Sequence, residues 1–140
     1  MTAPYRVLVT GSRDWDDVAT VRAALNSVLA ETPAPRPIIV VHGDCPTGAD
    51  IMAKVWATTW CGDERVAHEP VEAAWHLHGG AAGPRRNAVM VARGADVCLA
   101  FIGPCTSPKC RRTDPHGSHG ASGCADLAQA AGIPVRRWTA

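Results

Sequence analysis

The chain has 140 residues, 46% of them hydrophobic, which suffices for one ordinary core and predicts a single domain spanning residues 1–140. Its formal net charge of +1 gives no strong basic field, so the composition argues against nucleic acid as a partner. The N-terminal segment has no apolar run of signal-peptide or membrane-span length, so we expect a cytoplasmic protein with no membrane association. Its six cysteines should then be mostly reduced thiols.

The first half of the chain predicts two strands, each followed by a polar loop and a helix. The β-branched and apolar segment Arg6–Thr10 predicts the first strand. Apolar residues at helical spacing between 18 and 29 predict a helix, which the prolines at 33, 35 and 37 stop. Four apolar residues at 38–41 predict a strand buried on both faces. Thr47 and Asp50 have capping-box spacing and predict the start of the next helix, which should end near Gly62.

The second half continues the alternation. Its expected elements are a weaker strand at 65–69, a loop with one helical turn at 71–83, a helix from Pro84 to Gly94, a buried strand at 97–102, a helix at 121–131 and a last strand at 133–138. Five strands alternating with four helices predict an α/β fold in which a parallel sheet of about five strands carries helices on both faces.

Glycine-bearing loops follow the first two expected strands, at the carboxyl edge of the sheet. Free amides at such places suit phosphates and other anions. In the alternative interpretation, these loops are ordinary turns whose glycines serve backbone geometry, and Arg13 is a solvated cation. The candidate ligand-binding residues of the two loops are Gly11, Ser12, Arg13, His42, Gly43, Thr47, Gly48 and Asp50.

Arg85, Arg86 and Asn87 stand at the start of the helix that follows Pro84. Positive charge is slightly unfavourable at a helix N-terminus, so two arginines there favour contact with an anion over a purely exposed position.

The segment between the fourth strand and the last helix contains Cys105, Cys110, His116 and His119. Thiolates and imidazoles suit Zn²⁺, and four residues between the cysteines fit finger-like sites. The two residues between the histidines are fewer than the usual three to five. The alternatives are therefore a zinc site and a reduced polar loop whose Ser118 and His119 face a ligand.

The motifs GSRDW, HGDCPTGAD, GPRRN and GIPV, in this order along the chain, resemble the YspA-like branch of the SLOG superfamily. Its Rossmann-type relatives include the Lonely Guy phosphoribohydrolases and the DNA-processing protein DprA. The resemblance implies a Rossmann-like fold that binds a nucleotide, or a nucleotide-derived phosphorylated ligand, through the loop residues named above. Because relatives often dimerise, it also implies a homodimer.

One motif departs from the resemblance. Lonely Guy enzymes carry PGGxGTxxE, and the segment that fits it best here is HGSHGASGC, with Ala121 in place of Thr and Cys124 in place of Glu. Gly117, Ser118 and Gly120 could still hold a phosphate. Without the carboxylate, a sensor or sequestering protein is the first functional hypothesis. The alternatives are an N-glycosidic hydrolase of a nucleoside monophosphate or NAD-derived nucleotide and, more weakly, a DNA-binding module similar to DprA.

Overall fold

A computed structural model describes residues 3–140 of the chain, which form a five-stranded sheet with the strand order β3-β2-β1-β4-β5. Each pair of neighbouring strands is parallel, so the predicted Rossmann-like α/β architecture is confirmed. The strands are β1 (Tyr5–Gly11), β2 (Ile38–His42), β3 (Val66–Pro70), β4 (Val97–Ile102) and β5 (Val135–Thr139).

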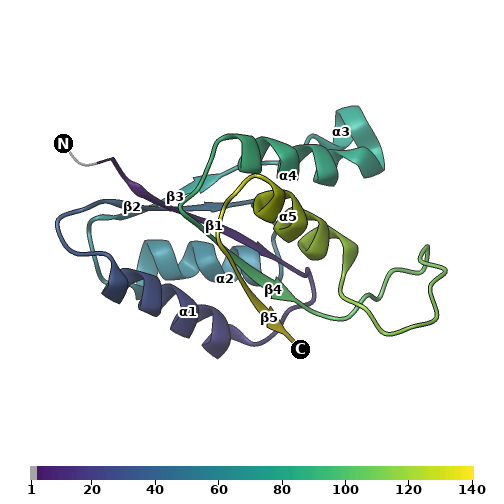
Figure 1. Ribbon diagram of the computed structural model, residues 1–140, viewed down its shortest axis with the longest axis horizontal. Helices are drawn as coiled ribbons and strands as arrows, with labels where there is room; N and C mark the ends of the chain where they lie inside the picture. Colours follow the sequence, from purple (N-terminus) through teal and green to yellow (C-terminus); the bar gives the residue numbers. More distant parts are fainter. Residues whose placement is uncertain (1–2) are drawn as a thin grey trace.

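Helices cover both faces of the sheet, with α1 and α2 on one side and α4 and α5 on the other (Figure 1). The short helix α3 lies beyond the end of α4, away from the sheet (Figure 1). The helices are α1 (Val18–Glu31), α2 (Ala49–Val55), α3 (Trp75–His78), α4 (Ala82–Ala92) and α5 (His119–Ala130).

The alternation of side chains along β1 divides the core between the two faces. Val7 and Val9 pack in the cluster that includes α1 and α2, whereas Leu8 packs with residues of α4 and α5. Every residue of β4 is buried, as expected for a strand covered on both faces. No helix among residues 3–140 has the length and apolar character needed to cross a membrane.

Some element boundaries differ from the sequence-based expectation. The helix that starts at Ala49 continues through a π-helical turn, Trp56–Trp60, and α5 starts at His119 rather than at residue 121. Trp56 is buried and its Nε1 donates to the Asn26 Oδ1 at 2.9 Å, whereas Trp60 is 42% exposed.

Candidate functional site

The carboxyl ends of the strands form the edge at which the predicted loops meet. The chain moves outward from β1 through β2 to β3, and then crosses over to β4 on the other side of β1. This reversal creates a topological switch point between β1 and β4, where open α/β sheets bind their ligands. The loops that follow Gly11 and Ile102 flank this point. The first predicted loop therefore lies where a ligand is expected.

Ser12 joins three segments that are far apart in the sequence. Its Oγ accepts a hydrogen bond from the Gly103 amide at 2.8 Å and lies 2.5 Å from the Ser118 Oγ. The Ser118 amide donates to the Gly103 carbonyl oxygen at 2.8 Å. The loop after β1, the loop after β4 and the start of α5 are thereby fixed together. Sequence reasoning selected both serines but missed Gly103, although its place directly after a buried strand was an available signal.

Two of the predicted glycines are required because backbone segments approach closely. A Cβ on Gly11 would lie 2.3 Å from the Cβ of Ala49, and a Cβ on Gly48 would lie 2.2 Å from the Ser12 carbonyl oxygen. Gly48 also has a φ of 74°, in the region that favours glycine. Backbone geometry is thus sufficient to explain both glycines, and their contact with a ligand stays a prediction.

The predicted capping box of Thr47 and Asp50 is wrong. Gly48 is the N-cap residue of α2, and Thr47 is exposed. The Asp50 Oδ2 instead accepts hydrogen bonds from the amides of Gly43, at 3.1 Å, and Cys45, at 3.3 Å. Burial raises the pKa of the Asp50 carboxyl to about 6, although these two hydrogen bonds act in the opposite direction. The loop after β2 folds back over the start of α2, so the buried Asp50 carboxylate can hold this loop in place through hydrogen bonds to the loop amides.

Arg85 and Arg86 are adjacent but have different surroundings. Arg86 is half-buried, with its Nη1 donating to the Gly43 carbonyl oxygen and its Nε donating to the Asn87 Oδ1 at 2.8 Å. The Asn87 Nδ2 in turn donates to the Gly120 carbonyl oxygen at 3.4 Å. Arg86 and Asn87 therefore tie the loop after β2 to the start of α5. Arg85 is exposed at the surface.

His42 is fully buried and hydrogen-bonded at both ring nitrogens. The Asp44 amide donates to its Nδ1 at 3.0 Å, and its Nε2 lies 3.0 Å from the Nδ1 of His68 in β3. Because Nδ1 accepts, neutral His42 carries its proton on Nε2 and donates it to His68. Burial, followed by the nearby His68, lowers the pKa of His42 to about 4, so the ring is neutral at pH 7. The sequence contained no indication that His68 is the partner of His42, because the two histidines are brought together only by the pairing of β2 with β3.

Arg13 is exposed at the carboxyl edge, next to Ser12. Its guanidinium carbon lies 5.0 Å from the centre of the Trp75 ring, a cation–π contact that restrains the side chain. Trp75 belongs to α3 and is 47% exposed, so the pair presents both a charge and an aromatic face to solvent.

The start of α5 combines close packing with an open position. Ser118 is the N-cap residue, and within residues 3–140 no side chain caps the helix. A Cβ on Gly117 would lie 2.5 Å from the Ile102 Cγ2, whereas a Cβ on Gly120 would meet no atom within 4 Å. The first-turn amides therefore have no side-chain partner, and the helix surface at Gly120 is open, an arrangement that suits an anion.

Cys124, which the motif resemblance aligns with the glutamate of Lonely Guy enzymes, is fully buried. Burial raises the pKa of its thiol above the usual value, so the group is uncharged at pH 7. It cannot supply the negative charge of the missing carboxylate. Cys98 in β4 is likewise buried, and burial raises the pKa of its thiol to about 12.

A hollow of about 360 Å³ opens at the same edge, between the loop after β1 and the C-terminal end of the chain. Sequence reasoning did not select it. Its acidic lining disfavours a phosphate in this hollow. The hollow is lined by Asp14, Trp15, Asp16, Asp17, Gly103, Pro104, Thr139 and Ala140.

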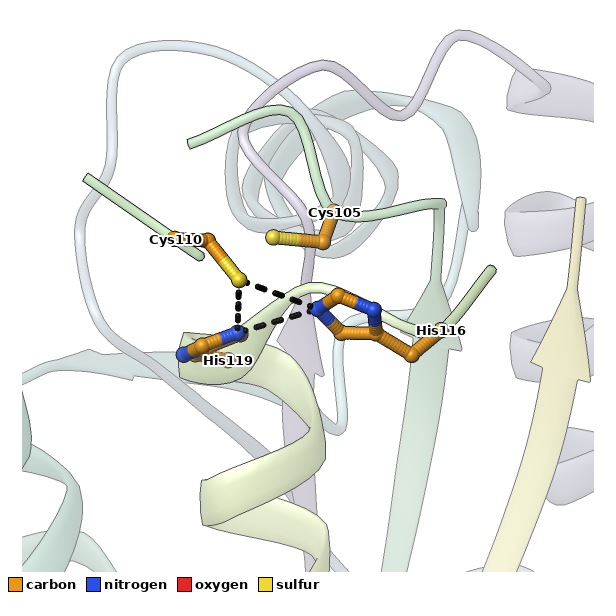
Figure 2. A group of neighbouring side chains, drawn as sticks. All are labelled: Cys105, Cys110, His116 and His119. Carbon is orange, nitrogen blue, oxygen red and sulfur yellow. Dashed lines mark hydrogen bonds between the residues drawn. The ribbon is translucent and has the colours of Figure 1, made fainter. Parts of the chain in front are cut away.

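The four predicted metal-ligating residues, Cys105, Cys110, His116 and His119, lie together (Figure 2). One ligand atom from each residue lies within 4.8 Å of the others, so the group could hold a metal ion such as Zn²⁺.

The chain is similar to known proteins over most of its length. The profile of the YspA, cpYpsA-related SLOG family matches residues 5–78, more than half of the chain. The chain is similar to the Gene 61 protein of Mycobacterium phage D29, with 43% identity over 134 residues that cover 93% of each protein. No solved structure matches the chain.

Proposed function

Because the chain belongs to the YspA, cpYpsA-related SLOG family, we propose that it binds a nucleotide or a phosphorylated nucleotide derivative at the carboxyl edge of its sheet. Membership of this family implies a nucleotide-related ligand. The observation that carries the proposal is the junction of Ser12, Gly103 and Ser118, which brings the uncapped start of α5 to the switch point.

The phosphate is proposed to lie at the first turn of α5. The amides beside Gly120 donate to it, and a further donor is the one O–H of Ser12 and Ser118 that is not used in their mutual hydrogen bond. Arg13 and Arg85, both exposed, provide the positive charge. Arg86 holds the loop after β2 in place through its hydrogen bond to the Gly43 carbonyl oxygen. The other proposed wall residues are Gly11, Gly43, Thr47, Gly48, Asn87 and Gly117, while the buried His42 and Asp50 hold the loop after β2 in place behind them.

A sensor or sequestering protein is the role that we favour over an enzyme. The observation against N-glycosidic hydrolysis is the neutral, buried thiol of Cys124 at the position of the expected carboxylate. The two roles differ in one measurement. Prolonged incubation of the protein with its ligand should release no free base, as followed by chromatography. Release of free base in an amount equal to the ligand added would instead establish the hydrolase.

The ligand class can be identified by mass spectrometry of small molecules released from gently purified protein. The recovered compound, or a panel of AMP, ADP-ribose and NAD, then serves as the probe in calorimetric titration. Recovery of no phosphorylated nucleotide, together with no binding by any member of the panel, would contradict the proposal.

The position of the phosphate can be tested with a matched pair of substitutions in α5. Gly120→Asp places a carboxylate in open space at the first turn, and Gly123→Asp places the same group in open space further along the helix. An aspartate near the N-terminus stabilises a helix by about 0.3–1 kcal/mol, so Gly120→Asp should not unfold the protein. It should nevertheless weaken binding at least tenfold by repelling the phosphate, whereas Gly123→Asp should change affinity less than threefold. Equal affinities of both variants would place the phosphate elsewhere.

Three further aspects of the proposed function are the cellular compartment, the exclusion of DNA as the ligand and the oligomeric state. The cysteines of residues 3–140 are all free, which supports a reducing compartment such as the cytoplasm. The net charge of +1 disfavours DNA as the ligand. Homodimerisation stays a prediction from the family resemblance.

A further inference from the structure

The segment between β4 and α5 leaves the fold and returns to it through a short paired base. Pro104 and Gly117 form an antiparallel bridge, and the Cys105 amide donates to the His116 carbonyl oxygen at 2.8 Å. Beyond this base, residues 106–115 read TSPKCRRTDP, in which Cys110 and two prolines are the only apolar side chains. Hydrophobic burial therefore cannot fix the tip of the loop, and another source of order is required.

The side chain of Cys110 returns from this tip to the base of the loop. Its Sγ lies 3.4 Å from the His116 Nε2 and 3.4 Å from the His119 Nε2, and the two nitrogens are 3.2 Å apart. Figure 2 shows these three atoms as a triangle, with the sulfur of Cys105 directed toward it.

These separations match the edges of a zinc tetrahedron. With Zn–S bonds of about 2.3 Å and Zn–N bonds of about 2.0–2.1 Å, an ideal tetrahedron has S···N edges of roughly 3.5 Å and an N···N edge of roughly 3.3 Å. The triangle of Cys110, His116 and His119 is within a few tenths of an ångström of these values. The spacing of two residues between the histidines is compatible with this geometry because His119 lies on the first turn of α5.

The tautomer of His116 is also fixed in the form that a metal requires. Its Nδ1 lies 2.8 Å from the Asp114 carbonyl oxygen, which can only accept, so Nδ1 carries the proton. The lone pair of Nε2 then faces the Cys110 sulfur. A backbone carbonyl that orients a ligating histidine in this way is a common feature of metal sites.

We propose that Cys105, Cys110, His116 and His119 bind one Zn²⁺ as a closed structural site. Four protein ligands leave no coordination position for substrate or water, so the ion orders the loop and takes no part in chemistry. Binding releases two thiol protons, and the resulting complex of Zn²⁺ with two thiolates and two neutral imidazoles has no net charge.

The ion would control the geometry of the neighbouring junction. Cys105 lies two residues after Gly103, and His119 directly follows Ser118. Metal binding at both residues therefore restrains the two segments that hold the start of α5 against Ser12. Because the complex is neutral, its influence on this region is through position rather than through added charge.

Cobalt provides a direct probe of the metal site in the full-length protein. Metal-free protein should bind one equivalent of Co²⁺, with the intense visible bands of a tetrahedral site and a thiolate-to-metal charge-transfer band, and one equivalent of Zn²⁺ should abolish both. Protein purified without chelator should contain about one zinc per chain. Zinc below a tenth of an equivalent, together with no tetrahedral cobalt spectrum, would overturn the proposal.

Substitutions assign the ligands. Cys110→Ser and His116→Gln should each weaken Zn²⁺ binding at least tenfold, and Cys110→Ser should also weaken the charge-transfer band. Cys61→Ser and His78→Gln, which alter the same residue types outside the group, should bind as the wild type does. Unchanged zinc affinity in both ligand variants would refute the assignment.

Hydrogen exchange tests the structural role without any substitution. Amides of residues 106–115 should exchange at least tenfold more slowly in zinc-loaded protein than in metal-free protein, while amides of β1 should be unaffected. Equal exchange in the two forms would show that the ion does not order the loop.

Discussion

Replacing Asp50 by Asn should change how stability depends on pH. The carboxyl has an ordinary pKa of 3.8 in the unfolded chain, and burial raises this to about 6 in the folded protein. Between these values the folded protein holds a proton that the unfolded chain has released, so the buried group destabilises the fold increasingly as pH rises. A difference of about two pKa units corresponds to about 3 kcal/mol, reached in full above pH 6.

Asn removes this pH-dependent cost while its Oδ1 can still accept the amides of Gly43 and Cys45. The free energy of unfolding of Asp50→Asn minus that of the wild type should therefore rise by about 2 kcal/mol from pH 4 to pH 7. Constant effects of the substitution cancel in this comparison. The measurement is urea unfolding followed by tryptophan fluorescence across this pH range.

His42 acts in the same pH window with the opposite sign. Its pKa is lowered from 6.5 to about 4, so the stability that it contributes is present above pH 6.5 and is lost as pH falls toward 4. In the wild type the two groups offset each other, and Asp50→Asn should expose the acid sensitivity due to His42. Asp126→Asn, at an exposed site, is the control and should give a nearly constant difference. A constant or falling difference for Asp50→Asn would refute the reasoning.

Three further predictions concern packing and the metal. Gly48→Ala should destabilise the protein by about 1–3 kcal/mol more than Gly62→Ala. Both glycines have positive φ, but only Gly48 lies against the Ser12 carbonyl oxygen. Equal losses of stability in urea unfolding would contradict this contact. Phe101→Ala should cost about 3–5 kcal/mol, since its fully buried ring packs on two tryptophans, and a loss below 1 kcal/mol would exclude this role. A zinc chelator should lower the Tm of the wild type but not that of Cys110→Ser; an unchanged wild-type Tm would count against a stabilising ion.

The sequence alone determined the elements and the places where polar groups gather. Strand runs such as 97–102 are apolar throughout, and the prolines after residue 32 cannot continue a helix, so local chemistry set the α/β alternation. The glycine loops after β1 and β2 could be recognised in the same way. So could the four metal-ligating residues, whose types and whose cysteine spacing already resemble a zinc site, although the histidine spacing does not.

Tertiary structure decided which side chains face one another. The predicted cap at Thr47 was wrong because Asp50 turns inward to the amides of its own loop, a choice that depends on burial rather than on spacing. Arg85 and Arg86 look alike in the sequence, yet only Arg86 meets the Gly43 carbonyl. Trp56 and Trp60 lie four residues apart on one helical segment, yet Trp56 is buried and Trp60 is 42% exposed.

The junction at the switch point is the clearest case of a feature that local patterns cannot contain. Ser12 and Ser118 are separated by 106 residues, and their contact exists because β1 lies between β2 and β4 in the sheet. Parallel pairing joins strands through hydrogen bonds that any backbone can make, so the strand order is set by how the helices cover both faces. The sequence could therefore indicate which loops carry polar groups, but the packing of the whole sheet determined which of them meet.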